Sequence, residues 1–166
     1  MNVSTMIYQP TSILEDENHI VKIGDRCVIG QFSFIAARKF IMEDGSEIGP
    51  GSIIGGGGDV TLMESSTLAF GVKLIPSTFT TKGKYMNDRI RESESVDMLR
   101  GSIVIGKGAY IGSGAVICVS ENNPHIRIGD FAVIGALTYI DKDVPPDTIV
   151  YARQTLDQSR RKYNEI

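Results

Sequence analysis

The sequence predicts an all-β fold: a solenoid of short parallel strands that winds around one axis and stacks coil upon coil. The first observation is a six-residue spacing of isoleucines in two runs, Ile105, Ile111 and Ile117, and Ile128, Ile134 and Ile140. An amphipathic helix would repeat near 3.6 residues and an isolated strand every two, so a fixed hexad fits neither. The second observation is that Gly or Ala follows many of these isoleucines, and a short repeat of this kind is typical of a solenoid.

Each hexad is expected to supply one short strand and one tight corner, with its β-branched residue pointing inward. The residue after it must be small so that the backbone can turn, and a second compact residue stands three positions further on. These compact residues are Cys27, Ser33, Ser52, Ala109, Ala115, Ala132 and Thr138. Three hexads close a triangular coil, and each strand finds hydrogen-bond partners only in the coils above and below it.

Taken in order, the chain begins with residues 1–19, which show no clear repeat and are expected to form an N-terminal cap or edge strand. The solenoid is predicted for residues 20–151. The inward positions of its first half are Ile23, Ile29, Ile35 and Ile41 and, after a slip of one residue, Ile48, Ile54 and Val60. Residues 152–166 are expected to form a tail with a short helix.

The repeat fails twice, and each failure predicts a loop extruded from the rod. Residues 77–101 are polar and charged without a core period, and a loop of this length is usually functional or disordered. Residues 121–125 form a short insertion, because eleven residues separate Ile117 from Ile128 where six would continue the coil. In repeat proteins such insertions tend to lie where ligands bind.

Composition narrows the classes of protein. A length of 166 residues is that of one domain, and the net charge of −3 argues against nucleic acid as the main partner. The first residues lack a charged segment followed by an apolar core, and no stretch approaches about 18 apolar residues. Neither secretion nor membrane insertion is expected, and the cytoplasm is the expected compartment. Cys27 and Cys118 are interpreted as compact fillers, since two cysteines make no disulfide framework.

Several motifs are similar to those of one superfamily. The pattern Ile-Gly-x-x-Ala-x at 105–110 and 111–116, with Lys-Asp-Val-Pro-Pro at 142–146, resembles the hexapeptide-repeat acyltransferases. Within that superfamily the chain resembles galactoside-type and capsule or O-antigen sugar acetyltransferases, also through Gly-Lys-Tyr-Met at 83–86 in a Ser/Thr-rich loop. The resemblance covers roughly residues 20–150 and implies a left-handed parallel β-helix. The left hand comes from the resemblance alone, because the usual crossover rule favours the right hand.

The resemblance implies an acetyl-CoA-dependent acetyltransferase that acts on a hydroxyl or amino group of a nucleotide-linked sugar or surface polysaccharide unit. Acetyl-CoA would lie in a groove between two subunits of a homotrimer, where small corner residues let the pantetheine arm approach the backbone, and no metal is expected. The residues implied for the cofactor are Ser113, Gly114, Gly135, Ala136, Lys142 and Arg153, with Arg160, Arg161 and Lys162 near the phosphates. Those implied for the substrate loop are Ser77, Thr78, Thr80, Lys84 and Tyr85.

Acyl transfer to a hydroxyl group needs a base, and a histidine suits that role near neutral pH. Galactoside-type relatives carry a catalytic histidine after a Gly-Val-x-Leu hexad, whereas residues 75–85 of this chain contain none. His19 precedes the first full hexad and is expected in the cap, so His125, at the end of the short insertion, is the candidate catalytic residue. Two routes stay open: His125 acts as the base, or the acceptor is an amine and needs a dedicated base less.

A second departure is the turn after the last coil. Relatives carry Gly-x-Pro-Ala-Lys or Gly-x-Pro-Ala-Arg there, whereas this chain carries Tyr-Ala-Arg at 151–153, which leaves the adenine-side contacts undefined. A zinc lyase of the gamma carbonic anhydrase type shares the β-helix, but its metal takes three histidines and the chain has two. A non-catalytic β-helix is the other alternative. Mixed outward residues disfavour an ice-binding surface, and the 77–101 excursion disfavours a scaffold.

Overall fold

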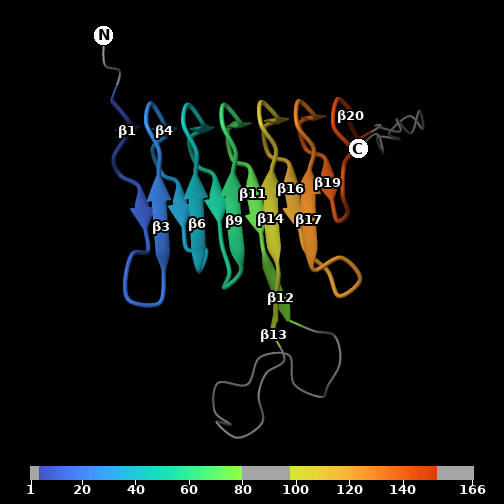
Figure 1. Ribbon diagram of the computed structural model, residues 1–166, viewed down its shortest axis with the longest axis horizontal. Helices are drawn as coiled ribbons and strands as arrows, with labels where there is room; N and C mark the ends of the chain where they lie inside the picture. Colours follow the sequence, from blue (N-terminus) through green and yellow to red (C-terminus); the bar gives the residue numbers. More distant parts are fainter. Residues whose placement is uncertain (1–3, 80–97, 153–166) are drawn as a thin grey trace, which may run out of the picture.

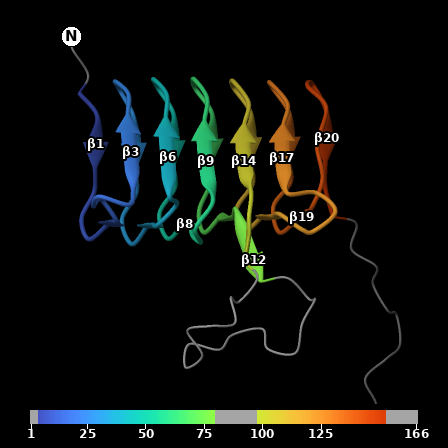
Figure 2. The same ribbon diagram turned by 60° about the horizontal axis from the view of Figure 1, so that its bottom comes forward.

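The chain folds into a regular rod of about five stacked coils, each made of three short strands. The structure is a computed structural model that describes residues 4–79 and 98–152. Equivalent strands of successive coils pair in parallel and build three sheets, which form the three sides of a prism (Figure 1). Figure 2 shows the coils side by side along the rod from β1 to β20. No helix occurs among the described residues, and the predicted all-β solenoid is confirmed.

Sheet A has seven strands: β1 (Met6–Ile7), β4 (Val28–Ile29), β7 (Glu47–Ile48), β10 (Thr67–Leu68), β15 (Tyr110–Ile111), β18 (Val133–Ile134) and β20 (Ile149–Val150). Sheet B has six: β2 (Ser12–Ile13), β5 (Phe34–Ile35), β8 (Ile53–Ile54), β11 (Lys73–Ile75), β16 (Val116–Cys118) and β19 (Tyr139–Ile140). Sheet C has five: β3 (Ile20–Ile23), β6 (Lys39–Met42), β9 (Asp59–Leu62), β14 (Ser102–Ile105) and β17 (His125–Ile128). A separate antiparallel pair consists of β12 (Ser77–Phe79) and β13 (Met98–Arg100).

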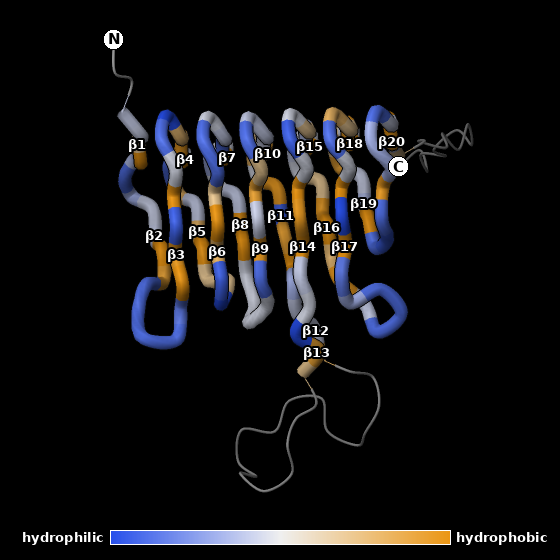
Figure 3. The backbone as a smooth tube through the Cα atoms, in the orientation of Figure 1, coloured by the Kyte–Doolittle hydropathy of each residue, from blue (hydrophilic) through white to orange (hydrophobic). Residues whose placement is uncertain are grey.

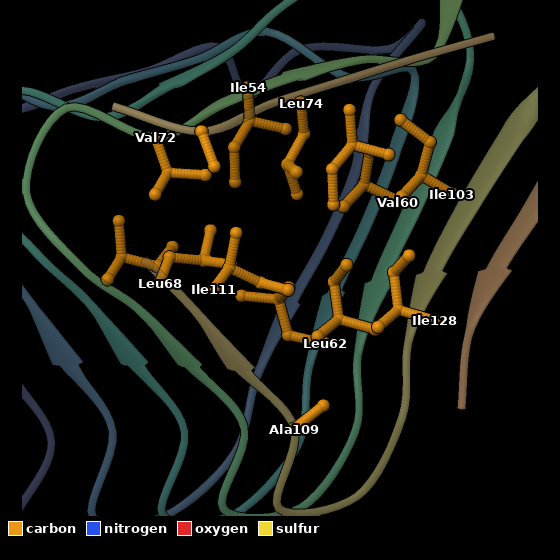
Figure 4. Packing of buried hydrophobic residues seen from close by; sticks show 14 of the residues in the cluster. Ile54, Val60, Leu62, Leu68, Val72, Leu74, Ile103, Ala109, Ile111 and Ile128 are labelled. Carbon is orange, nitrogen blue, oxygen red and sulfur yellow. The ribbon is translucent and has the colours of Figure 1, made fainter. Parts of the chain in front are cut away.

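The core is a column of aliphatic side chains along the axis of the rod. Ile111 is fully buried, and its strand neighbours are Leu68 in the preceding coil and Ile134 in the following one. Figure 4 shows such side chains meeting from the sides of the prism. Figure 3 shows the apolar strand segments separated by polar connections. The compact residues predicted for the corners are at most 5 % exposed, which confirms that part of the repeat.

The predicted inward position of Ile41 is wrong. Ile41 is half-buried on the outer face of β6, whereas Phe40 and Met42 on either side of it are buried. The strands of sheet C are four residues long and send two side chains inward, while the two-residue strands of sheet A send one. The coils from β4 to β7 and from β7 to β10 are therefore one and two residues longer than three hexads. The slip in the repeat falls between Ile35 and Met42.

The glycines that follow inward isoleucines are required by stacking rather than by the turn. A Cβ atom on Gly112 would lie 2.5 Å from the backbone nitrogen of Ala136 in the next coil. The turn itself is made two residues later, where Gly114 has a φ of +68°. The physical reason expected from the sequence is thus corrected, because the small residue leaves room for the neighbouring coil.

The two ends of the chain differ in how much of them the structure describes. At the N-terminal end, β1 and β2 pair in parallel with β4 and β5, so residues 6–13 supply edge strands of the solenoid. The predicted tail helix within 152–166 lies outside the described residues. The part of the chain that is described contains no helix long and apolar enough to cross a membrane.

Candidate functional site

The connections that vary in length leave the rod at the edge between sheets B and C, here called the B–C edge. Connections from sheet A to sheet B, and from sheet C to sheet A, have four residues in each coil, as in 112–115. At the B–C edge the connections are residues 14–19, 36–38, 55–58, 76–101, 119–124 and, before Val144 bridges to Ile128, 141–143. Figure 1 shows connections 14–19 and 119–124 and the strands β12 and β13 along the lower side of the rod. The two insertions expected from the sequence therefore leave the same edge of adjacent coils.

The base of the long excursion is an ordered antiparallel pair, β12 and β13, which the sequence reasoning treated as part of an irregular loop. In this pair Ser77 lies opposite Arg100. Both side chains bind the backbone of one residue of the preceding coil: the N–H of Gly57 donates to Ser77 Oγ at 2.9 Å, and Arg100 Nη1 donates to the Gly57 carbonyl at 3.2 Å. A Cβ atom on Gly56 would collide with Ser77 Oγ. The base of the excursion therefore packs against the glycine-rich turn 55–58, which leaves room for it.

The expected substrate-loop residues fall partly within this base. Ser77 is buried and its hydroxyl is engaged by the backbone of Gly57. Thr78 is half-buried, and its Oγ1 donates to the carbonyl of Phe79 at 3.4 Å. Thr80, Lys84 and Tyr85 lie outside the described residues. Contact of this segment with a sugar stays a prediction.

His125 is the first residue of β17 and points outward from sheet C. Because β14 and β17 pair in register, Ser102 stands beside it, and Asp59 of β9 is next in the same outward row. His125 Nδ1 and Ser102 Oγ are 2.9 Å apart. The carboxylate of Asp59 accepts two hydrogen bonds from the guanidinium group of Arg38, at 3.0 and 2.8 Å. The row places an imidazole and a hydroxyl side by side at the edge from which the excursion leaves.

Ser102 was missed by the sequence reasoning, although the repeat contains a signal for it. Ser102 precedes Ile-Val-Ile-Gly just as His125 precedes Ile-Arg-Ile-Gly. Aligning the two segments on their Ile-Gly pairs places Ser102 and His125 at equal offsets. Equivalent positions of adjacent coils are neighbours in a solenoid, so the contact between them follows from the repeat.

Charged side chains near His125 are largely compensated. Arg127 lies two residues further along β17 on the same face, and its Nη2 donates to Asp130 at 3.0 Å. The backbone N–H of Arg127 donates to Asp143 Oδ1 at 2.8 Å. Lys142, expected near the cofactor phosphates, is exposed between the exposed residues Asp141 and Asp143. A cofactor phosphate at Lys142 would therefore meet two neighbouring carboxylates as well as the ammonium group.

The other expected cofactor residues lie at a different edge of the prism. Ser113 and Gly114 belong to the A–B connection of one coil, and Gly135 and Ala136 to that of the next. The two connections stack directly, because the N–H of Leu137 donates to the Ser113 carbonyl at 2.9 Å. These four residues form one stripe, and sheet B separates it from His125 within the chain. Arg153, Arg160, Arg161 and Lys162 lie outside the described residues.

The second histidine, His19, makes a local contact in the first coil. His19 Nδ1 is 2.7 Å from Asp16 Oδ1 within the turn that leads into β3, and this contact holds the pKa of Asp16 below its ordinary value. In the described part of the chain, no three His, Cys, Asp or Glu side chains cluster in a way that would hold a metal ion. The geometry thus gives His19 a local structural partner and leaves His125 as the histidine beside the insertions.

Three curated relatives match parts of the chain. The dTDP-4-amino-4,6-dideoxy-D-glucose acyltransferase of Escherichia coli is 27 % identical over 131 residues, 78 % of this chain and 66 % of the relative. The galactoside O-acetyltransferase of Escherichia coli K12 is 32 % identical over 94 residues, 55 % of this chain and 43 % of the relative. The chloramphenicol acetyltransferase of Escherichia coli is 44 % identical over 68 residues, 40 % of this chain and 30 % of the relative. The chain thus spans two thirds or less of each relative. No protein-family model matches it.

Solved structures share the solenoid. AntD, an N-acyltransferase from Bacillus cereus solved with dTDP and 3-hydroxybutyryl-CoA, superposes with a TM-score of 0.75 at 16 % identity. The match covers 89 % of this chain and 75 % of AntD. A hexapeptide-repeat acetyltransferase from Vibrio cholerae superposes with a TM-score of 0.52 at 20 % identity, covering 89 % of this chain and 65 % of that one. At these identities the structural matches establish the fold. The resemblance seen in the repeats is therefore confirmed: the chain is a β-solenoid similar in sequence to acyltransferases.

Proposed function

We propose that the chain is an acyl-CoA-dependent acyltransferase whose acceptor is the amino group of a nucleotide-linked sugar. The relative matched over 78 % of this chain is named for acyl transfer to a dTDP-linked 4-amino sugar. AntD is an N-acyltransferase and was solved with a dTDP-linked amino sugar as well as with coenzyme A. Both support an acyl-CoA donor and a nucleotide-linked acceptor for this chain.

The observation that carries the proposal is the meeting of both insertions at the B–C edge. A rod that serves only as a scaffold has no need to extrude two loops from adjacent coils, and insertions in repeat proteins tend to line ligand sites. The hydrogen bonds of Gly57 with Ser77 and Arg100 hold the base of one insertion against the preceding coil. The other insertion ends at His125, whose ring lies against Ser102 of β14. An acceptor that lies against this edge would meet an imidazole.

An amine is favoured over a hydroxyl as the acceptor group. The segment 75–85, in which galactoside-type relatives carry their catalytic histidine, contains none in this chain. A neutral amine attacks a thioester carbonyl without prior removal of a proton, whereas a hydroxyl needs a base during the attack. With an amine, less is required of His125, because it only takes the proton released as the new amide forms.

Acyl-CoA is proposed to lie along the stripe of Ser113, Gly114, Gly135 and Ala136. The small residues of this stripe expose backbone groups to a pantetheine arm. Lys142, in the connection after β19 at the other edge of sheet B, is proposed for the cofactor phosphates together with Arg153. Because sheet B separates the stripe from His125 within one chain, a site that uses both needs a neighbouring subunit. This requirement is compatible with the homotrimer that the family resemblance implies. Nucleotide-linked sugars and acyl-CoA are cytoplasmic compounds, so the proposal places the protein in the cytoplasm. A role in polysaccharide biosynthesis is proposed with it.

The outer face of sheet B offers a surface for that assembly. Phe34, Ile53, Lys73, Val116 and Tyr139 occupy one outward row of this sheet, apolar apart from the exposed Lys73 in its middle. Phe34 is 41 % exposed, Ile53 37 % and Tyr139 61 %, which is unusual for large apolar side chains on three strands of one sheet. We expect sedimentation equilibrium at micromolar concentration to show a trimer. A monomer at every concentration would remove the intersubunit site from the proposal.

The decisive experiment compares three acceptors, two of which differ only in the group at C4 of the sugar. The purified protein is mixed with acetyl-CoA and either dTDP-4-amino-4,6-dideoxyglucose, the corresponding 4-hydroxy sugar nucleotide, or a simple galactoside. Release of free thiol and a gain of one acetyl group in the product mass are measured. We expect turnover with the amino sugar and little with the others. Equal or faster turnover of a hydroxyl acceptor would contradict the amine assignment. No turnover with any of these acceptors, in a protein that is folded, would favour the non-catalytic scaffold.

A further inference from the structure

We propose that Ser102 is a positioning residue for His125: it accepts the hydrogen bond of the Nδ1–H group and so leaves Nε2 as the nitrogen that takes the acceptor's proton. The inference rests on the proposed acyl transfer at the B–C edge and adds a residue that neither the sequence motifs nor the named relatives single out. It concerns the tautomer of one ring, whose Nδ1 lies 2.9 Å from Ser102 Oγ.

The backbone fixes this contact. Strands β14 and β17 pair in parallel over four residues, with Ser102 opposite His125 and Ile105 opposite Ile128. The alternate residues of both strands, including Ile103 and Ile126, are buried in the core, so a slip of the register would expose them. Ser102 is therefore held on the same outward face as the imidazole, and neither residue reaches the other through a flexible loop.

The direction of the hydrogen bond decides whether the ring is a base. A neutral imidazole carries one N–H group, and its other nitrogen carries the lone pair. If Nδ1–H donates to Ser102 Oγ, then Nε2 has the lone pair and can accept a proton. If the serine hydroxyl donates to Nδ1, then Nε2 carries the hydrogen and cannot act as a base. The proposal commits to the first arrangement, in which Nδ1 donates a hydrogen bond and Nε2 accepts the proton. In many functional histidines a hydrogen bond to one ring nitrogen sets the role of the other in this way.

The proton balance of the step is complete. The lone pair of the acceptor nitrogen attacks the thioester carbonyl, the C–S bond breaks, and the sulfur leaves as a thiolate. The proton that the acceptor nitrogen loses passes to His125 Nε2, which gives an imidazolium with both nitrogens bonded to hydrogen. That imidazolium then protonates the leaving thiolate and returns to its starting tautomer. Ser102 accepts from Nδ1–H throughout and exchanges no proton itself.

Among residues 4–79 and 98–152, three charged side chains on neighbouring elements bear on the ring. Arg127 shares β17 and the outward face with His125, and it is paired with Asp130. Asp59 lies two strands away on β9 and is held by Arg38. Glu121 belongs to the short insertion that precedes His125. The group in direct contact with Nδ1 is thus a neutral hydroxyl, so replacing it with a carboxylate makes a sharp test.

The experiment uses three substitutions of Ser102 and one control in the full-length protein. Ser102→Ala removes the acceptor, Ser102→Thr keeps a hydroxyl, and Ser102→Asp supplies an atom that can only accept from Nδ1–H. Thr61→Ala is the control, because Thr61 is a half-buried outward residue of the same sheet. The kcat, the KM for the amino sugar and the pH profile of kcat/KM are measured for each. Ring ¹⁵N chemical shifts report the tautomer of His125 independently of activity, with His125→Gln to assign the signals.

We expect Ser102→Ala to lower kcat by about 3- to 10-fold with little change in KM, well below the 100- to 10,000-fold that a positioned base contributes, because an amine acceptor requires less of His125. Ser102→Thr and Thr61→Ala should stay close to wild type. Ser102→Asp should keep most of the activity and move the acidic limb of the profile to higher pH, because a carboxylate stabilises the imidazolium. The wild-type ring should show hydrogen on Nδ1, and Ser102→Ala should shift the ring toward the Nε2–H tautomer.

The outcomes separate this inference from the function on which it rests. An active wild type with an unchanged Ser102→Ala variant would overturn the positioning role and leave the acyltransferase intact. A wild-type ring with hydrogen on Nε2 would overturn it as well, whatever the activity. A folded wild type without turnover on any acceptor would overturn the function and the catalytic part of the inference together.

Discussion

Replacing Gly112 with alanine tests the stacking of the coils at a single atom. A Cβ atom at this position would lie 2.5 Å from the nitrogen of Ala136, 2.7 Å from the carbonyl carbon of Gly135 and 2.8 Å from the oxygen of Ile134. All three are backbone atoms of the next coil, so no side chain can rotate out of the way. The N–H of Gly112 also donates to the Ile134 carbonyl at 2.7 Å, which fixes the two coils at this separation.

The magnitude follows from two opposing terms. Forcing an extra carbon atom into a packed site costs typically about 1–3 kcal/mol, and here the distortion must move backbone. Removing the freedom of a glycine from the unfolded chain returns about 0.4–1 kcal/mol. The net destabilisation expected for Gly112→Ala is on the order of 2 kcal/mol, since immovable neighbours push the first term to its upper range and the second term returns part of it.

Gly55 provides the matched control. A Cβ atom there would lie 3.6 Å from Ile53 Cγ2, which is ordinary van der Waals contact, and the backbone of Gly55 does not have a positive φ. Gly55→Ala should therefore leave the free energy of unfolding unchanged or raise it by about 0.4–1 kcal/mol. The two variants make the same chemical change, so their difference isolates the contact with the next coil.

The assay is denaturant unfolding followed by circular dichroism at one fixed protein concentration, because an oligomer's stability depends on concentration. Gly112→Ala should lower the midpoint with an unchanged denaturant dependence, as expected of a folded-state effect. Equal midpoints for Gly112→Ala and Gly55→Ala would refute the assignment of Ile-Gly pairs to the contact between coils, and with it the register of sheets A and B.

Three further predictions concern the core, the cofactor and the thiols. Ile111→Ala should lower the free energy of unfolding by about 2–5 kcal/mol, and Ile111→Asp by more, because it buries an unpaired charge; an unchanged melting temperature for Ile111→Asp would contradict the register. Lys142→Ala should weaken binding of coenzyme A, measured by calorimetry, more than binding of pantetheine, which lacks the nucleotide; equal losses would move the phosphates elsewhere. Burial raises the pKa of the Cys118 and Cys27 thiols, so both carry less thiolate at a given pH and should react slowly with a disulfide reagent near neutral pH, and faster as the pH rises. Rapid labelling of both in the folded protein would contradict their placement.

The fold could be predicted from the sequence because every coil fills its core and stacks on its neighbours with the same kinds of residue at the same spacing. A buried aliphatic, a glycine that admits the next coil and a compact corner residue recur at Ile105, Ile111 and Ile128, and all three isoleucines are fully buried. The prediction failed at Ile41. A count of six assumes one inward residue in each strand, but β6 has four residues and two inward positions. Phe40 and Met42 fill both. A repeat predicts equivalent positions well only while each side of the coil has the same length.

The candidate site could be predicted in part. His125 was expected because it ends the one short insertion, and the structure places it at the edge shared with the long excursion. Its contact with Ser102 was not expected, because the partner lies 23 positions earlier in the chain and has no motif of its own. The stripe of Ser113 and Gly135 could not be joined to the histidine by sequence reasoning, since the two lie at different edges and only a second subunit would bring them together.

The three edges of the prism explain why a site would form where it does. Two edges are closed by four-residue turns in each coil, and those turns need a residue with positive φ, such as Gly108, Gly114 or Phe131. An added residue there would break the turn and displace the next coil. The B–C edge accepts connections of different length, and the excursion closes its own base by pairing β12 with β13. Loops can therefore change at this edge without disturbing the stacked core. The outward side chains at the start of the sheet C strands are the ones that rigid backbone holds beside such loops, and His125 and Ser102 are two of them.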